Sequence, residues 1–183
     1  MMTRRQSVTT AFLVFAAICV TNAATPQRDH LTPLEIDRVK EAQILDKRID
    51  VFIKAVDRRL MVLNGTQAAN AKQLKKDAEL WGDPPAGSPA ELIGDISRIL
   101  DEAITNIDDV GARDERNPLI GKSLRKLAQA VNNITTQLAP FRDKAKTDAE
   151  VASLEMLSED AEQILAAAKK LPPEVEKKGK SKQ

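Results

Sequence analysis

Three carboxylates in the segment 89–110 are spaced so that they could bind a cation from one face of a helix. Asp95, Glu102 and Asp109 recur at intervals of seven residues, so a helix would place them in one stripe. A Ca²⁺ ion takes about six to eight oxygen ligands, which one helix alone does not supply. Arg98 is also close enough along a helix to pair with the first two carboxylates. We therefore interpret the stripe as a solvated, salt-bridged face, with a weak cation site as the alternative.

The residue counts exclude most metal, haem and nucleophile chemistry. The chain has one histidine, His30, and one cysteine, Cys19. Iron-carboxylate bundles need Glu-x-x-His pairs on facing helices, and covalent haem needs Cys-x-x-Cys-His. Neither can be built from this sequence, and without a paired histidine no nucleophile can be named. We expect no cofactor, no metal centre and no enzymatic activity, and we expect His30 to be solvated.

A second apolar stripe distinguishes the segment 33–63. Its main apolar face supplies one seam of a core, and four further apolar residues lie about 100–120° from the centre of that face on a helix. These residues are Ile44, Val51, Ala55 and Val62. They need a second covering surface. Either the segment 67–81 covers them inside the fold, or an unknown partner protein or a second copy of the chain binds there.

Helix start signals indicate where the elements that carry these residues begin. In a capping box, Ser or Thr precedes the helix and Glu follows three residues later, and both side chains accept hydrogen bonds from free backbone N–H groups. Three such boxes and one Asn-Pro start occur, at 32–35, 88–91, 147–150 and 117–118. Apolar residues at helical spacing continue from each start, so each predicts a helix.

Four long helices and one short one are predicted from this pattern. The long helices cover 33–63, 89–110, 118–144 and 148–171, and a weaker helical pattern covers 67–81. No stretch has the alternating pattern of a strand. We predict an all-α fold, an up-and-down antiparallel four-helix bundle with one additional short helix. On the helix 89–110, Asp101 and Asp108 would flank the opposite edge of the apolar face from the carboxylate stripe.

The first 23 residues have the composition of a secretory signal peptide. Arg4 and Arg5 are followed by an apolar stretch at 8–20, and Ala23 precedes the expected cut. As a helix, that stretch spans about 20 Å, which is less than the roughly 30 Å hydrocarbon core of a membrane. We therefore expect a cleaved signal and no stable membrane anchor. The protein would be exported, periplasmic or extracellular, and most in keeping with a bacterial envelope.

Charge and domain organisation limit the function further. The chain has 28 basic and 27 acidic residues, and cleavage would remove two basic residues and the cysteine. Such a balance gives no net attraction for nucleic acid. We expect one helical-bundle domain over 24–172 and a disordered, lysine-rich tail over 173–183.

The predicted function follows from these exclusions. We predict a non-catalytic macromolecular interaction protein of the cell envelope, whose specific function the sequence does not identify. The alternative is a periplasmic chaperone or stress protein that acts through exposed apolar helix surfaces. A cation-binding or enzymatic bundle is the third choice.

Overall fold

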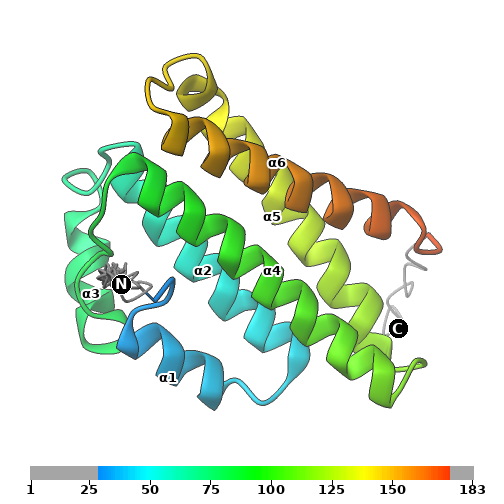
Figure 1. Cartoon of the computed structure of the whole chain (residues 1–183). Helices are drawn as coiled ribbons and strands as arrows, with labels where there is room; N and C mark the ends of the chain where they lie inside the picture. Colours follow the sequence, from blue (N-terminus) through cyan, green and yellow to red (C-terminus); the bar gives the residue numbers. More distant parts are fainter. Residues whose placement is uncertain (1–28, 174–183) are drawn as a thin grey trace, which may run out of the picture.

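The fold is all-helical. A computed structural model describes residues 29–173, which form six α-helices and contain no strand. The helices are α1 (Pro33–Glu41), α2 (Leu45–Leu63), α3 (Ala71–Trp81), α4 (Pro89–Arg113), α5 (Pro118–Arg142) and α6 (Asp148–Lys169) (Figure 1). The all-α prediction is confirmed. The predicted signal peptide, and the predicted tail beyond residue 173, lie outside the described residues.

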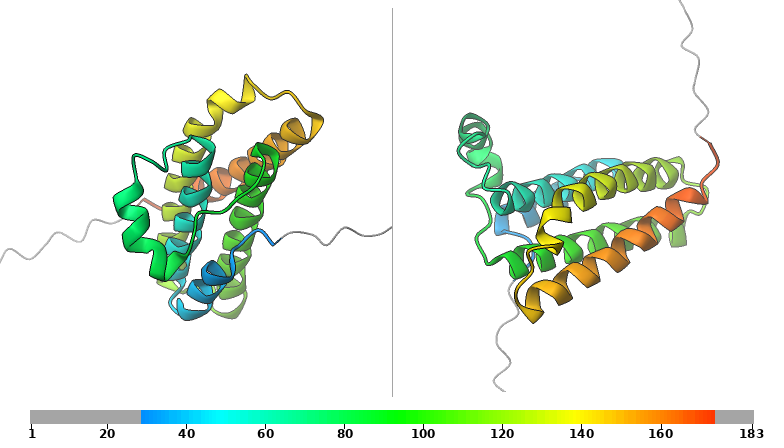
Figure 2. Two further views of the ribbon diagram at one scale, coloured as in Figure 1. Left: turned by 90° about the vertical axis from the view of Figure 1, so that its left-hand side faces the viewer. Right: turned by 90° about the horizontal axis from the view of Figure 1, so that it is seen from above.

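The four long helices α2, α4, α5 and α6 pack around one apolar core (Figures 1 and 2). α4 contacts α2 and α6, and α5 contacts the same two helices. α4 and α5 follow one another in the chain but contact each other less than they contact α2 and α6. The core is filled by aliphatic side chains and one phenylalanine, including Ile49, Phe52, Ile96, Leu127 and Leu157, each no more than 1% exposed. This packing is that of a helical bundle.

The predicted helix starts are confirmed in atomic detail. The side chains of Thr32, Ser88 and Thr147 each accept a hydrogen bond from the backbone N–H of the glutamate three residues later. Each glutamate side chain accepts in return from the backbone N–H of the capping residue. Asn117 caps α5 by accepting from the backbone N–H of Leu119 at 3.0 Å. These starts depend on local sequence alone, which is why the pattern located them.

The single helix predicted over 33–63 is wrong, because residues 42–44 interrupt it. No glycine or proline lies at this break. Arg48 holds it: its Nε donates to the carbonyl oxygen of Ala42 at 2.9 Å, and its Nη1 donates to Asn106 Oδ1 at 2.8 Å. α1 therefore packs against α2 as a separate helix, and the fold has two short helices, α1 and α3, instead of one. α4 also continues through Gly111 to Arg113, beyond its predicted end.

Candidate binding site

Glu35 is the centre of a buried cluster of charges between α1 and α2. Its Oε1 accepts from Arg58 Nε at 3.0 Å and from Arg59 Nη1 at 3.2 Å. Its Oε2 accepts from Arg59 Nη2 at 3.0 Å and from the backbone N–H of Thr32 at 2.9 Å. The side chain of Glu35 is fully buried, and each arginine is 1% exposed. The glutamate that caps α1 thus also neutralises two buried arginines.

The same cluster extends to α3 and α4. Asp95 of α4 is fully buried, and its carboxylate lies 3.7 Å from Arg59 Nε and accepts from Arg98 Nη2 at 2.8 Å. Arg58 Nη2 donates to the backbone oxygens of Trp81, at 2.9 Å, and of the two residues that follow. Buried charges are tolerated when each has a close partner of opposite sign. We therefore interpret the cluster as a junction that joins four helices.

The structure does not bring the three predicted cation ligands together. Asp95 is held by arginines in the buried cluster. Glu102 Oε2 lies 2.8 Å from Nε2 of His30, which is therefore partly buried and paired where the sequence predicted a solvated residue. Asp109 is exposed. Within residues 29–173 no group of three or more His, Cys, Asp or Glu side chains is placed to hold a metal ion.

The second apolar stripe of α2 is not one continuous exposed surface. Ile44 is 56% exposed, whereas Ala55 is fully buried, and Val51 and Val62 are partly buried. The short helix that packs against α2 is α1, which the sequence pattern had merged with it. Binding of a partner along all four residues stays a prediction, and Ala55 is inaccessible to such a partner in this conformation.

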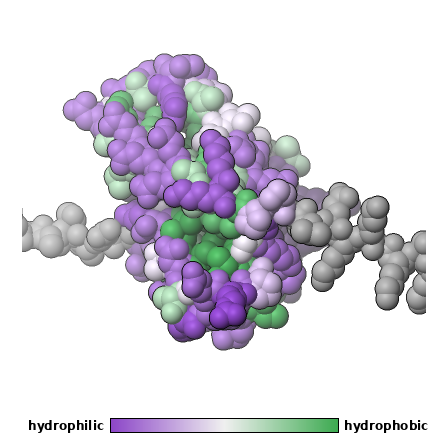
Figure 3. Space-filling model, turned by 90° about the vertical axis from the view of Figure 1, so that its right-hand side faces the viewer, coloured by the Kyte–Doolittle hydropathy of each residue, from purple (hydrophilic) through white to green (hydrophobic). Residues whose placement is uncertain are grey.

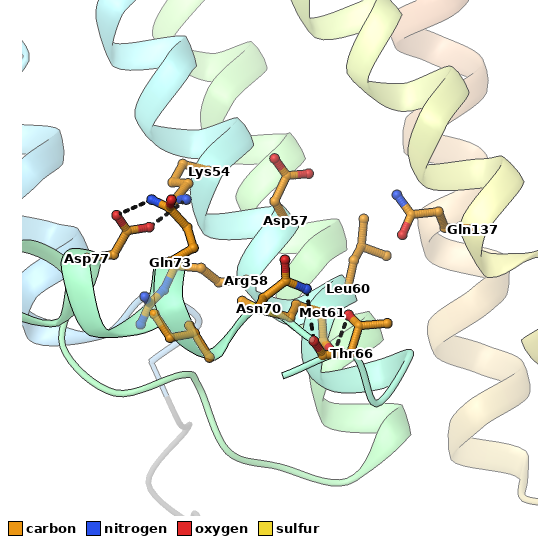
Figure 4. Close-up of a pocket in the computed structure, with 11 residues that line it drawn as sticks. Lys54, Asp57, Arg58, Leu60, Met61, Thr66, Asn70, Gln73, Asp77 and Gln137 are labelled. Atoms are coloured by element: carbon orange, nitrogen blue, oxygen red, sulfur yellow. Dashed lines mark hydrogen bonds and ion pairs between the residues drawn. The ribbon is translucent and has the colours of Figure 1, made fainter. Parts of the chain in front are cut away.

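α3 borders a polar pocket of about 250 Å³ beside α2 (Figure 4). No residue of α3 is buried. The helix is held by an ion pair of 2.9 Å between Lys54 Nζ and Asp77 Oδ2, and Gln73 donates to the same aspartate at 2.7 Å. The guanidinium of Arg58 also lies 6.0 Å from the centre of the Trp81 ring. Several polar groups in this pocket are therefore already paired with each other, which disfavours it as a ligand site.

A second cavity, of about 230 Å³, opens between α4 and α6. Its lining comprises Leu100, Asp101, Ile104, Ile107, Asp108, Leu124, Asp160, Gln163, Ile164 and Ala167, and we name it the acidic groove. The floor is apolar, with Leu100, Ile107 and Ile164 between 1% and 3% exposed. Among residues 29–173, three carboxylates and no lysine or arginine line it. Figure 3, which faces the side where α4 and α6 end, shows an apolar area bordered by hydrophilic side chains.

Asp160 is the most desolvated carboxylate of the acidic groove. Burial raises the pKa of Asp160 above its ordinary value, and the negative charges of Asp101 and Glu159 raise it further. The hydroxyl of Ser97 donates a hydrogen bond to Asp160 Oδ2, which opposes this rise in pKa. Negative charge is thus concentrated beside an apolar floor. That arrangement favours a ligand that carries both a positive charge and an apolar group.

No protein-family model, curated protein or solved structure matches the chain. The function of the chain is therefore inferred from its own geometry. Residues 29–173 also contain no helix that is both long and apolar enough to span a membrane.

Sequence reasoning placed Asp101 and Asp108 at the edge of an apolar face but missed Asp160. This third carboxylate belongs to another helix, and the groove depends on how α4, α5 and α6 pack together. A sequence pattern within one helix carries no signal for that packing.

Proposed function

We propose that the protein is a non-catalytic interaction protein that holds a basic, partly apolar segment of a partner in the acidic groove. The observation that carries this proposal is the apolar floor edged by Asp101, Asp108 and Asp160, where the described part of the chain contributes no basic side chain to the lining. A lysine or arginine of the partner would gain electrostatic attraction at the rim, while apolar atoms would cover the floor.

The absence of a paired nucleophile and base at this groove favours binding over catalysis. The described histidine, His30, pairs with Glu102, and neither residue lines the acidic groove. Within residues 29–173, no cysteine or histidine lines the groove to form a nucleophilic pair with its carboxylates.

Export is a second part of the proposal. It is supported by the signal-peptide composition of residues 1–23, where two arginines precede an apolar stretch and Ala23 precedes the expected cut. The compartment would be periplasmic or extracellular. We further propose that α2, α4, α5 and α6 form an up-and-down antiparallel four-helix bundle, to which α1 and α3 are added. The short connections at 114–117 and 143–147 support this topology.

The proposal is tested with a basic amphipathic peptide as the probe. We expect a short lysine–leucine peptide to bind, and a glutamate–leucine peptide of the same length not to bind. Changing both Asp101→Asn and Asp108→Asn should weaken binding roughly tenfold or more, and the affinity should fall as salt is added. The control variant changes Asp37→Asn and Asp109→Asn, which removes the same charge from exposed positions outside the groove.

Calorimetric titration of the three proteins gives the result. Equal affinity in all three, or equal binding of both peptides, would contradict the proposal.

A chaperone function is the second candidate, and α3 favours it. This helix contributes no buried residue, is held largely by polar contacts, and carries Leu80 at 49% exposure. Release of α3 would expose apolar side chains to an unfolded client. Asp77→Asn removes the ion pair with Lys54, so α3 should be released more easily. If the protein is a chaperone, this variant should therefore suppress the aggregation of reduced insulin more strongly than the wild-type protein does. No suppression by either protein would exclude this candidate.

A further inference from the structure

Two adjoining apolar grooves flank residues 143–147, which connect α5 to α6. One has a volume of about 390 Å³ and the other of about 290 Å³, and they share Ala145 and Leu154. Ile93 and Phe141 extend the apolar floor on one side, and Val151, 42% exposed, extends it on the other. Val151 is an exposed apolar side chain beside these grooves, and apolar side chains that gather at an accessible surface are typical of an interaction site.

Basic side chains edge this surface. Arg142, Lys144 and Lys146 line the two grooves and are exposed. Two carboxylates, of Glu150 and Glu155, also line them. The carboxylate of Glu150 is already engaged, because it accepts from the backbone N–H of Lys146 at 2.8 Å and from that of the next residue at 3.2 Å. We name this surface the basic end, since its apolar floor and cationic edge complement the acidic groove.

The acidic groove and the basic end cannot meet within one molecule. Both include residues of α6: Leu154 belongs to the basic end and Ile164 to the acidic groove. Ten residues of helix separate these two by roughly 15 Å along the axis. Residues 150–158 of α6 contribute to the basic end and residues 160–167 contribute to the acidic groove, so the two surfaces occupy opposite halves of this helix. A contact between them therefore requires two copies of the chain.

On the basis of the proposed function, we infer that the partner at the acidic groove is a second copy of this chain, which docks there with its basic end. Asp101, Asp108 and Asp160 of one copy would then face Arg142, Lys144 and Lys146 of the other, around the contact of the two apolar floors. Different surfaces of the two copies meet, so the contact is head-to-tail. Each added copy leaves one groove and one basic end exposed, and assembly continues into a filament or closes into a ring.

Two charge-reversal variants test the inference by sedimentation velocity. The groove variant carries Asp101→Lys and Asp108→Lys, and the end variant carries Lys144→Glu and Lys146→Glu. All four side chains are exposed, and far-UV dichroism confirms that each variant stays folded. We expect the wild-type protein to associate with increasing concentration and to dissociate with added salt. Each variant alone should be monomeric.

Mixing the two variants distinguishes a head-to-tail contact from a general loss of association. The groove variant has a basic groove and a basic end, whereas the end variant has an acidic groove and an acidic end. An equimolar mixture therefore restores opposite charges at both kinds of contact, and it should associate in alternating order and grow as the wild-type protein does. A chain with all four changes has a basic groove and an acidic end, and it should associate again. Failure of both the mixture and the four-change chain to associate would overturn the inference.

The remaining outcomes separate this inference from the proposed function. A wild-type protein that stays monomeric at all concentrations yet binds the lysine–leucine peptide would overturn the inference, and the acidic groove would then serve a foreign basic partner. A monomer that does not bind the peptide would contradict both. A chain ending at residue 173 provides the last control, because Lys177, Lys178, Lys180 and Lys182 follow that residue. If the shortened chain does not associate while the end variant associates normally, then those lysines and not the basic end bind the acidic groove. That result would overturn the inference.

Discussion

Carboxylates of α4 have different environments in two neighbouring regions of the same helix. Asp95 is fully buried, and two arginines, Arg59 and Arg98, neutralise it. Asp101 and Asp108 are exposed and edge a cavity to which the described residues contribute no basic side chain. The type of residue is the same, and the partner brought by the fold differs. Buried, paired carboxylates hold helices together, whereas carboxylates beside an apolar opening are available to another molecule.

The largest expected effect comes from disrupting the buried ion pairs of Glu35. Glu35→Gln keeps a side chain that can cap α1 but leaves Arg58 and Arg59 buried without their shared anion. Removal of one partner from a buried ion pair typically costs about 3–5 kcal/mol of unfolding free energy. Glu150→Gln is the matched control, because Glu150 occupies the same capping position in α6 without an arginine partner. Urea unfolding of both variants measures the difference, and equal losses would show that only the cap matters.

A somewhat smaller loss is expected where apolar packing alone joins the helices. Leu127 of α5 is fully buried in the core, away from the charged cluster. Leu127→Ala should lower the unfolding free energy by about 2–5 kcal/mol, because it removes buried apolar atoms and leaves a cavity. Leu80→Ala serves as the control, since Leu80 is 49% exposed and its loss should change stability by less than about 0.5 kcal/mol. If Leu127→Ala lowers the unfolding free energy by less than about 1 kcal/mol, this part of α5 does not pack in the core.

The features that the sequence predicted are those that depend on neighbouring residues. Capping boxes located the starts of α1, α4 and α6, because cap and glutamate lie three residues apart. Apolar periodicity placed residues such as Leu127 and Val131 on a buried face. Glu35 was recognised as a cap, but its second role was not, because that role needs Arg58 and Arg59, more than 20 residues away.

The features that the sequence missed depend on contacts between distant segments. The break at 42–44 contains no helix-breaking residue, and Arg48 holds it partly through Asn106 of α4. The acidic groove combines residues of three helices, so it depends on how those helices pack against one another. The predicted stripe of Asp95, Glu102 and Asp109 had the right period for one helix, but the neighbouring helices determined what each residue contacts.

A smaller effect is expected at α3, where the charged cluster reaches the surface. Trp81→Ala removes the ring beside the guanidinium of Arg58 but keeps the backbone oxygen that accepts from it. A cation–π contact at a partly exposed site contributes about 0.5–1 kcal/mol. Hydrogen exchange should therefore accelerate across α3 and remain unchanged in α4 and α5. Unchanged exchange in α3 would show that Trp81 does not help to hold this helix.

The smallest effect concerns the acidic groove and depends on pH. The pKa of Asp160 is raised in the folded protein by burial, so the ionised form at pH 7 destabilises the fold. Asp160→Asn keeps an oxygen that accepts from Ser97 and removes the charge. The variant should therefore have a slightly higher melting temperature at pH 7, and the difference should disappear as the pH falls to the ordinary aspartate value of 3.8.

The pKa of Asp46 is shifted in the opposite direction from that of Asp160. A hydrogen bond from Lys122 lowers the pKa of Asp46, so its ionised form stabilises the fold above pH 3.8, and that contribution is lost as the pH falls through the lowered pKa. Asp46→Asn should therefore lower the melting temperature at pH 7, and this loss should shrink in acid. Thermal unfolding of both variants from pH 7 to pH 3 checks the two signs together. A lower melting temperature for both variants at pH 7 would mean that Asp160 is held by an attractive partner, and the acidic groove would then lack the excess negative charge on which binding of a basic segment depends.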